Sequence, residues 1–277
     1  MRNLRVGIGQ IITRLGDIKG NRERILRFIE KGTKEDVDVI VFPELSTLGF
    51  GSGDIYLDKI NENLKLVEEL IELSKKIKPY LIIGFVDRDE RGFFYNAAGL
   101  IGNGKLIGVH RKLQLVNYRL FDEKRYFAPG TRAQVFNAPW GKTGILICED
   151  VWFPEPARIL AFRGAEVIFV LSASPFDREK PEVWKTFLTS RVYDNILPII
   201  MVNQAGVQDG VTYWGGSMVF DASGNLLHQA KLLEEEFSVA EVNLELSKVL
   251  RRRDIRLRET RFEVIEELLN AYKEMQK

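Results

Sequence analysis

The chain has 277 residues, 45% hydrophobic and 29% charged, a balance typical of a soluble globular protein with a sizeable core. Forty basic and 39 acidic residues leave a net charge of +1, which favours neither nucleic acid nor a membrane surface as a partner. One cysteine excludes an intrachain disulfide framework and fits a reducing compartment. No apolar run approaches 18 residues and no signal-peptide pattern opens the chain, so we expect a cytoplasmic protein without a membrane span.

The first half of the chain alternates between strand and helix patterns and ends in a hairpin. Its turn signal is Gly102-Asn103-Gly104. The expected elements, in order, are a strand at 4–11, a helix at 22–31, a strand at 37–42, a helix near 61–77, and strands at 80–86, 93–101 and 105–110.

The second half repeats this pattern without sequence identity to the first. Its expected elements are a strand at 143–147, a helix at 156–163, a strand at 167–171, a helix at 182–195, a strand at 198–202, and a hairpin of 216–220 and 226–229. Alternating strands and helices predict mainly parallel pairing with helices over the sheet. Two half-sheets packed face to face would form a four-layer α-β-β-α sandwich of the α/β class.

The boundaries of this domain are harder to place at the C-terminal end. No Pro/Gly/Ser-rich linker divides the halves, so we expect a single domain over 1–277. From about residue 244 a tail carries Arg251-Arg252-Arg253 and then a helical pattern. Such a charge run is either a solvated face or part of an arm that packs on a partner subunit.

Three ionisable residues follow three of the expected strands. Glu44 follows strand 37–42, Lys112 follows strand 105–110, and Cys148 follows strand 143–147. If the strands are parallel, their carboxyl ends place these groups at one edge, where open α/β sheets bind ligands. Taken singly, Glu44 could cap a loop, Lys112 could be a solvated lysine and Cys148 could be a small buried hydrophobe.

Together the three groups indicate a cysteine hydrolase that works without histidine. The carboxylate would accept the thiol proton and later activate water, the thiol would form the covalent intermediate, and the ammonium would stabilise the oxyanion. Pro154 and Pro156 suit the first turn of a helix just after Cys148. The partial positive charge of that helix start would favour a lowered thiol pKa. Only two histidines are present, so no histidine-rich metal site is expected.

These residues carry a resemblance to the nitrilase superfamily of carbon–nitrogen hydrolases. It rests on three runs in the family's order: Phe42-Pro43-Glu44-Leu45, His110-Arg111-Lys112-Leu113 and Leu146-Ile147-Cys148-Glu149-Asp150. Within the superfamily the chain most resembles the glutaminase domains of glutamine-dependent NAD synthetases. Supporting runs include Asn117–Phe127, Ser172–Phe176 and Val202–Gly206.

The resemblance also implies roles for individual residues. Glu44 would be the general base, Lys112 the oxyanion-stabilising lysine, Cys148 the nucleophile, and Glu123 a second glutamate that positions the amide and supports the lysine. The backbone N–H of Glu149 would be the other oxyanion donor. Glu149, Tyr118 and Ser174 match positions that line a glutamine pocket, and Arg178, four residues beyond Ser174, is a candidate for the substrate carboxylate. The family further implies no metal, no organic cofactor, and a homodimer or larger homo-oligomer.

Several functions remain open at this point. The synthetase-type run Ser-Gly-Gly-x-Asp-Ser is absent, so we expect a stand-alone amidase that releases ammonia from a small carboxamide such as glutamine. An N-carbamoyl-amine hydrolase or a nitrilase would use the same three reactive residues. The alternative from another class is a catalytically silent partner subunit of a separate synthetase.

Overall fold

The computed structural model describes residues 3–51, 53–118 and 121–276, and its framework is a pair of six-stranded sheets. The first sheet has the order β14-β1-β2-β3-β4-β5. Its strands are β1 (Asn3–Gln10), β2 (Val39–Val41), β3 (Tyr80–Arg88), β4 (Phe94–Gly102), β5 (Lys105–Arg111) and β14 (Glu236–Asn243). β1, β2 and β3 are parallel, whereas β4, β5 and β14 pair with their neighbours in antiparallel fashion.

The second sheet has the order β13-β12-β9-β8-β7-β6 and a parallel centre of three strands. Its strands are β6 (Val135–Ala138), β7 (Gly141–Ile147), β8 (Val167–Ser172), β9 (Ile199–Asn203), β12 (Met218–Phe220) and β13 (Leu226–Gln229). A separate ribbon of β10 (Ala205–Gln208) and β11 (Val211–Trp214) lies between β9 and β12 in sequence.

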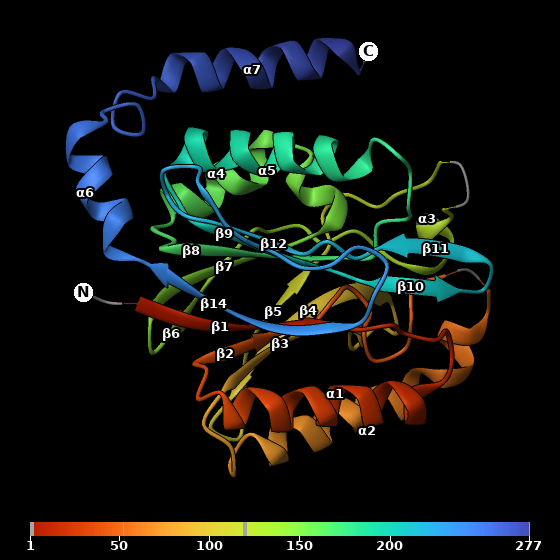
Figure 1. Ribbon diagram of the computed structural model, residues 1–277. Helices are drawn as coiled ribbons and strands as arrows, with labels where there is room; N and C mark the ends of the chain where they lie inside the picture. Colours follow the sequence, from red (N-terminus) through yellow and green to blue (C-terminus); the bar gives the residue numbers. More distant parts are fainter. Residues whose placement is uncertain (1–2, 52, 119–120, 277) are drawn as a thin grey trace.

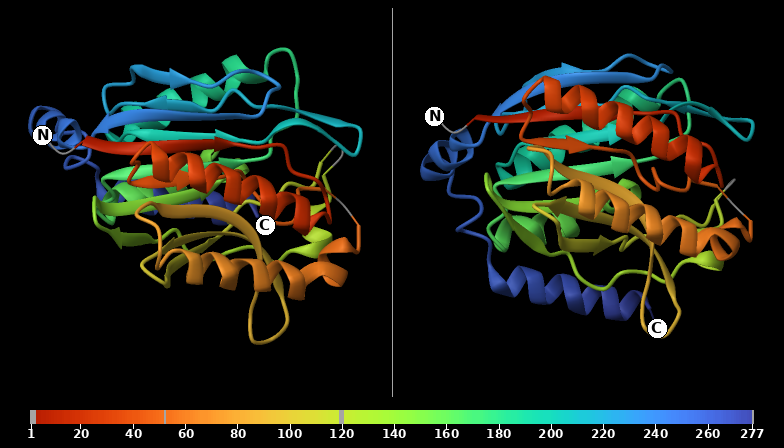
Figure 2. Two further views of the ribbon diagram at one scale, coloured as in Figure 1. Left: turned by 60° about the horizontal axis from the view of Figure 1, so that its bottom comes forward. Right: turned by 90° about the horizontal axis from the view of Figure 1, so that it is seen from below.

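Helices cover the outer face of each sheet, so the four-layer α-β-β-α arrangement expected from the sequence is confirmed (Figure 1). α1 (Ile18–Lys34) and α2 (Ile55–Leu73) lie side by side on the first sheet, as both views of Figure 2 show. α4 (Pro154–Phe162) and α5 (Lys180–Asn195) cover the second sheet. The short helices α3 (Glu123–Tyr126) and η1 (Cys148–Val151) lie at strand ends. In the described ranges no helix has the length and apolarity needed to cross a membrane.

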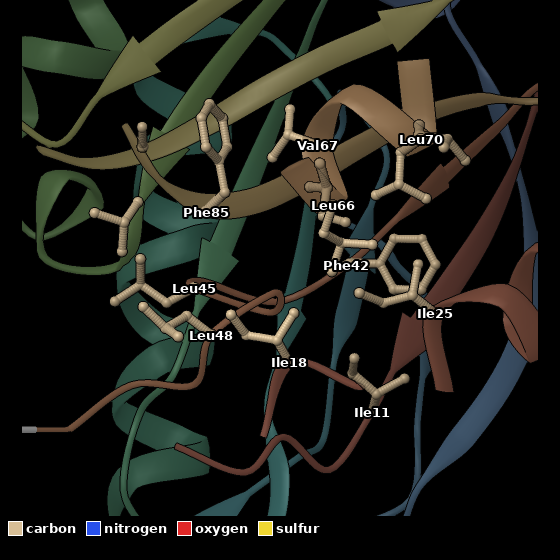
Figure 3. Packing of buried hydrophobic residues seen from close by; sticks show 14 of the residues in the cluster. Ile11, Ile18, Ile25, Phe42, Leu45, Leu48, Leu66, Val67, Leu70 and Phe85 are labelled. Carbon is tan, nitrogen blue, oxygen red and sulfur yellow. The ribbon is translucent and has the colours of Figure 1, made fainter. Parts of the chain in front are cut away.

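Three apolar clusters lie between the four layers. The middle cluster joins alternate residues of both sheets, among them Val6, Val41, Ile147 and Val202. A second cluster packs the other face of the first sheet against α1 and α2 (Figure 3). The third packs the second sheet against α4 and α5. Strands covered on both faces are expected to be continuously apolar, as β2 and β8 are.

Local sequence explains most of the element boundaries. The β4–β5 hairpin turns at Asn103 and Gly104, which both adopt the positive φ that a two-residue hairpin loop requires. α4 begins at Pro154, where the missing N–H of proline costs no helical hydrogen bond. α2 begins at Ile55, six residues before the expected start, because Tyr56 and Ile60 extend its buried face.

Four strands were not predicted: β6, β10, β11 and β14. β14 is the most consequential, because it leaves the second half of the chain and pairs with all eight residues of β1. Phe237 and Val239 of β14 pack toward α1 and α2, whereas Ala240 and Val242 face the middle cluster.

Beyond β14 the chain forms α6 (Glu245–Arg253) and α7 (Phe262–Met275). α7 has no buried residue and lies outside the four layers (Figure 1).

Candidate active site

The ends of three strands bring Glu44, Lys112 and Cys148 together. Lys112 directly follows β5 and Cys148 directly follows β7, while Glu44 lies three residues beyond β2. Two successive antiparallel pairings make β5 run in the direction of β2, so their carboxyl ends share one edge of the first sheet. β7 belongs to the second sheet, and Cys148 lines the same pocket as Lys112.

A buried cluster of charged groups forms the floor of this site. The Lys112 Nζ atom donates to Glu44 Oε1 at 2.7 Å and to Glu123 Oε2 at 2.8 Å. Lys112 and Glu44 are fully buried, and Glu123 is 3% exposed. The side-chain amide of Asn96, on β4, donates one hydrogen bond of 2.8 Å to each carboxylate. The lysine and the two acids are therefore held as one unit.

A backbone N–H donates one further hydrogen bond to each carboxylate. Glu44 Oε2 accepts from the N–H of Ala173, beyond β8 of the second sheet, at 2.9 Å. Glu123 Oε2 also accepts from the N–H of Val116 at 2.7 Å. These bonds orient both carboxylates and link the two sheets at the site.

The surroundings shift the pKa values of Lys112 and Glu123. Burial disfavours the ammonium of Lys112, but the negative charges of Glu123 and Glu44 outweigh it and raise the lysine pKa well above its ordinary value. Burial raises the pKa of Glu123, and the nearby Lys112 opposes that rise. Lys112 therefore remains a cation at neutral pH.

Cys148 starts η1 with a φ of +45°, an uncommon conformation for a residue with a side chain. Ser172 at the end of β8 places its hydroxyl 3.5 Å from the sulfur. Burial and then the charge of Glu44 raise the pKa of the thiol well above its ordinary value. The expected lowering by a helix start is thus wrong, because burial of the thiol, reinforced by the charge of Glu44, disfavours the thiolate. The free thiol is protonated at neutral pH and needs a base.

A small pocket opens above Cys148. Its lining is mainly aromatic and polar: Phe50, Lys112, Val116, Tyr118, Phe121, Cys148, Glu149, Trp152, Ala173, Ser174, Pro175, Lys180 and Trp184. The Tyr118 hydroxyl lies 3.2 Å from both carboxylate oxygens of Glu149. Burial and the Glu149 charge raise the pKa of Tyr118 to about 12, and burial raises the pKa of Glu149. Tyr118 therefore remains a hydrogen-bond donor at neutral pH.

The predicted pocket residues are not all brought together. Ser174 is nearly buried in the lining, where its hydroxyl accepts from the indole N–H of Trp184 at 3.0 Å. Arg178 is exposed and lies outside this lining. Lys180, the first residue of α5, supplies a cation to the pocket instead, with its Nζ 4.8 Å from the ring centre of Trp152.

Asn96, Lys180 and Trp152 were not singled out from the sequence. Asn96 carried a usable signal, since it is the polar residue in the apolar run Tyr95-Asn96-Ala97-Ala98 of a buried strand. Lys180 carried none, because it is one of several charged residues between Asp177 and Glu182.

Comparison with known proteins identifies the family of the chain. Residues 5–252 match the carbon-nitrogen hydrolase family. The glutamine-dependent NAD(+) synthetase of Thermotoga maritima is 37% identical over 249 residues, which are 88% of this chain and 43% of that protein. The chain therefore spans less than half the length of that relative.

Two solved structures show the same fold. The glutamine-dependent NAD+ synthetase of Acinetobacter baumannii matches with a TM-score of 0.82 and 32% identity over 88% of this chain and 46% of that chain. A carbon-nitrogen hydrolase of Helicobacter pylori G27 matches with a TM-score of 0.87 and 27% identity over 96% and 98% of the two chains. This chain belongs to the carbon–nitrogen hydrolase family of the nitrilase superfamily and is homologous to the nitrilase-like domain of glutamine-dependent NAD synthetases.

Proposed function

We propose that the protein is an amidase that hydrolyses a small carboxamide through a cysteine thioester. The observation that carries this proposal is the buried Glu44–Lys112–Glu123 cluster beside a protonated thiol. Neither nucleophile nor oxyanion donor is useful without the other, and here both share one pocket. The same intact cluster argues against a catalytically silent subunit.

In the acylation half-reaction Glu44 takes the proton of the Cys148 thiol as the sulfur attacks the amide carbon. The carbonyl oxygen becomes an anion that the Lys112 ammonium stabilises, assisted by the backbone N–H of Glu149. The C–N bond then breaks, and Glu44 returns its proton to the departing nitrogen, which leaves as ammonia. Glu123 and Asn96 hold Lys112 and Glu44 in place throughout.

In the second half-reaction Glu44 removes a proton from water, and the hydroxide attacks the thioester. Lys112 again stabilises the oxyanion. The C–S bond breaks, the sulfur recovers a proton from Glu44, and the carboxylic acid is released and ionises. One base thus serves both half-reactions, which fits a carboxylate held by three hydrogen bonds.

We propose further that the substrate is glutamine or a similar α-amino acid with a side-chain carboxamide. The pocket presents an acid, Glu149, and a cation, Lys180, above the thiol. They are suited to an α-ammonium and an α-carboxylate, while Tyr118 and Ser174 add hydroxyls. Sites built to pair polar substrate groups reject analogues that lack them by up to about 10⁴-fold.

A substrate panel tests this assignment directly. Ammonia release would be measured with glutamine, asparagine, butyramide, an N-carbamoyl amino acid and a small nitrile. We expect glutamine to give the highest kcat/KM. If butyramide matches it, the pocket serves plain aliphatic amides, and preference for the carbamoyl compound or nitrile would establish one of the alternative activities.

We also propose that the tail after residue 244 packs on a second copy of the chain. Seven apolar side chains of α7 are exposed: Phe262, Val264, Ile265, Leu268, Leu269, Tyr272 and Met275. A 14-residue helix without packing is marginal in water, so α7 needs a surface to cover it. Light scattering should give a dimer or larger assembly for the whole chain and fewer subunits per particle after truncation at residue 261. An unchanged number of subunits would refute the proposal.

A further inference from the structure

The distance between the oxyanion-stabilising lysine and the nucleophile is set across two sheets. The backbone of Lys112 is anchored to the first sheet, because its N–H donates to the carbonyl of Asn96 at 2.8 Å. Cys148 continues β7 of the second sheet. Apart from the hydrogen bond between Glu44 and Ala173, the sheets pack at the site through apolar side chains, whose attraction is non-directional and does not by itself define a position to a fraction of an ångström.

One buried carboxylate joins the two segments. Asp150, in the same turn as Cys148, is fully buried. Its Oδ1 atom accepts from the N–H groups of Leu113 and Gln114, the two residues after Lys112, both at 2.9 Å. Its Oδ2 atom accepts from the N–H of Ile147, the residue before Cys148, at 3.0 Å.

The fourth contact of Asp150 comes from a histidine on the lysine's own strand. His110 Nε2 lies 2.8 Å from Asp150 Oδ2, and neither side chain is exposed. His110 Nδ1 has no hydrogen-bond partner among the described residues, so Asp150 is the contact that fixes the ring. Asp150 therefore connects residues on both sides of Lys112 to the strained turn that carries the thiol.

We propose that Asp150 and His110 form a positioning unit that fixes the Lys112 ammonium relative to the Cys148 sulfur. Asp150 contacts His110 and the backbone N–H groups of residues 113, 114 and 147, and neither side chain lines the pocket, so their role is positioning. The unit matters for the step in which the oxyanion forms, because that step needs the sulfur at the carbonyl carbon while the lysine contacts the carbonyl oxygen bonded to it. The kinetic consequence of this inference rests on the proposed amidase chemistry. Its structural consequence is independent of that chemistry.

The structural consequence is tested without substrate. Amide hydrogen exchange would be compared among the native protein, His110→Leu, His110→Gln and His228→Leu. The amide group of Gln can reach the place of His110 Nε2 and donate to Asp150, whereas Leu cannot. We expect faster exchange at Leu113 and Gln114 in His110→Leu, recovery in His110→Gln, and no change for the other histidine. Unchanged exchange in His110→Leu would overturn the proposal, whether or not the protein is an amidase.

The kinetic consequence separates positioning from a general loss of structure. A misplacement of about 1 Å can cost about 10²-fold in rate, so we expect kcat for the amide to fall roughly 10- to 100-fold in His110→Leu with little change in KM. Iodoacetamide alkylates Cys148 by displacement at a saturated carbon, which creates no oxyanion. The alkylation rate should therefore stay within about twofold of native, because alkylation does not need the oxyanion stabilisation that Lys112 supplies. Proportional losses of turnover and alkylation would mean a folding defect and would overturn the positioning role.

Discussion

The floor and the wall of the pocket are built differently. On the floor, Lys112, Glu44 and Glu123 are at most 3% exposed and hold one another through hydrogen bonds of 2.7–2.8 Å and a shared asparagine. The wall is the polar part of the pocket lining formed by Tyr118, Glu149 and Lys180. Tyr118 is 48% exposed, and its hydroxyl lies 3.2 Å from the Glu149 carboxylate. The floor is thus fixed before substrate arrives, whereas the wall has freedom to adapt. Changes to the floor should lower kcat, and changes to the wall should raise KM.

The largest effect is expected from Cys148→Ala, which removes the nucleophile. Amide hydrolysis should fall below detection. The fold should persist, because the substitution removes only one sulfur atom. Iodoacetamide should label the native protein once, at Cys148, since it is the only cysteine. Substrate should slow that labelling. Turnover near the native rate would refute the assignment of Cys148 as the nucleophile.

Glu44→Gln removes both the general base and its negative charge, and we expect it to affect turnover and alkylation of the thiol in opposite ways. A general base usually contributes roughly 10²–10⁴-fold to the rate, and we expect turnover to fall by at least the upper end of this range. Alkylation should respond in the opposite sense at neutral pH. Burial and the Glu44 charge both raise the thiol pKa, so loss of the charge lowers it and increases the thiolate fraction. The pH midpoint of alkylation should therefore move to lower pH. Near-native turnover would transfer the base role to Glu123.

Lys112→Met should lose about 10²–10³-fold in kcat, the size of one oxyanion donor. Glu123→Gln should lose less, because the lysine keeps its bond to Glu44. The double variant should be far more active than the product of the two losses predicts, since the residues act as a unit. It also removes a carboxylate that Lys112→Met alone leaves buried without its cation. Strictly multiplicative losses would show that Glu123 acts independently of the lysine.

The smallest effect is expected on the wall. Lys180→Met should raise KM for glutamine by about tenfold, the lower range for a hydrogen bond to a charged group, and leave kcat nearly unchanged. Butyramide, which has no carboxylate, should be unaffected. Lys185→Met on the same helix lies outside the pocket lining and is the matched control. An equal effect on both amides would mean that Lys180 shapes the pocket without reading the carboxylate.

The same contrast decides how much could be predicted from the sequence. Strand ends were predictable, because β2 and β7 are short apolar runs that end in chemically distinctive residues. Arg178 lies on the loop between β8 and α5 and Lys180 begins α5, a stretch without periodicity, so the sequence could not decide which of the two reaches the pocket. The direction of the Cys148 pKa shift depends on the burial of the thiol and then on the Glu44 charge beside it, neither of which spacing along the chain reveals.

The pairing of β14 with β1 also determines the order in which the protein can be completed during synthesis. The outer edge of β1 is covered by residues 236–243, which are translated more than 220 residues later. Until then β1 presents a bare edge, the kind of template that promotes aggregation. Contacts so distant in sequence also slow folding. A nascent chain that stalls before residue 236 would therefore expose the start of its first sheet, and we expect such fragments to depend on chaperones that the finished protein no longer needs.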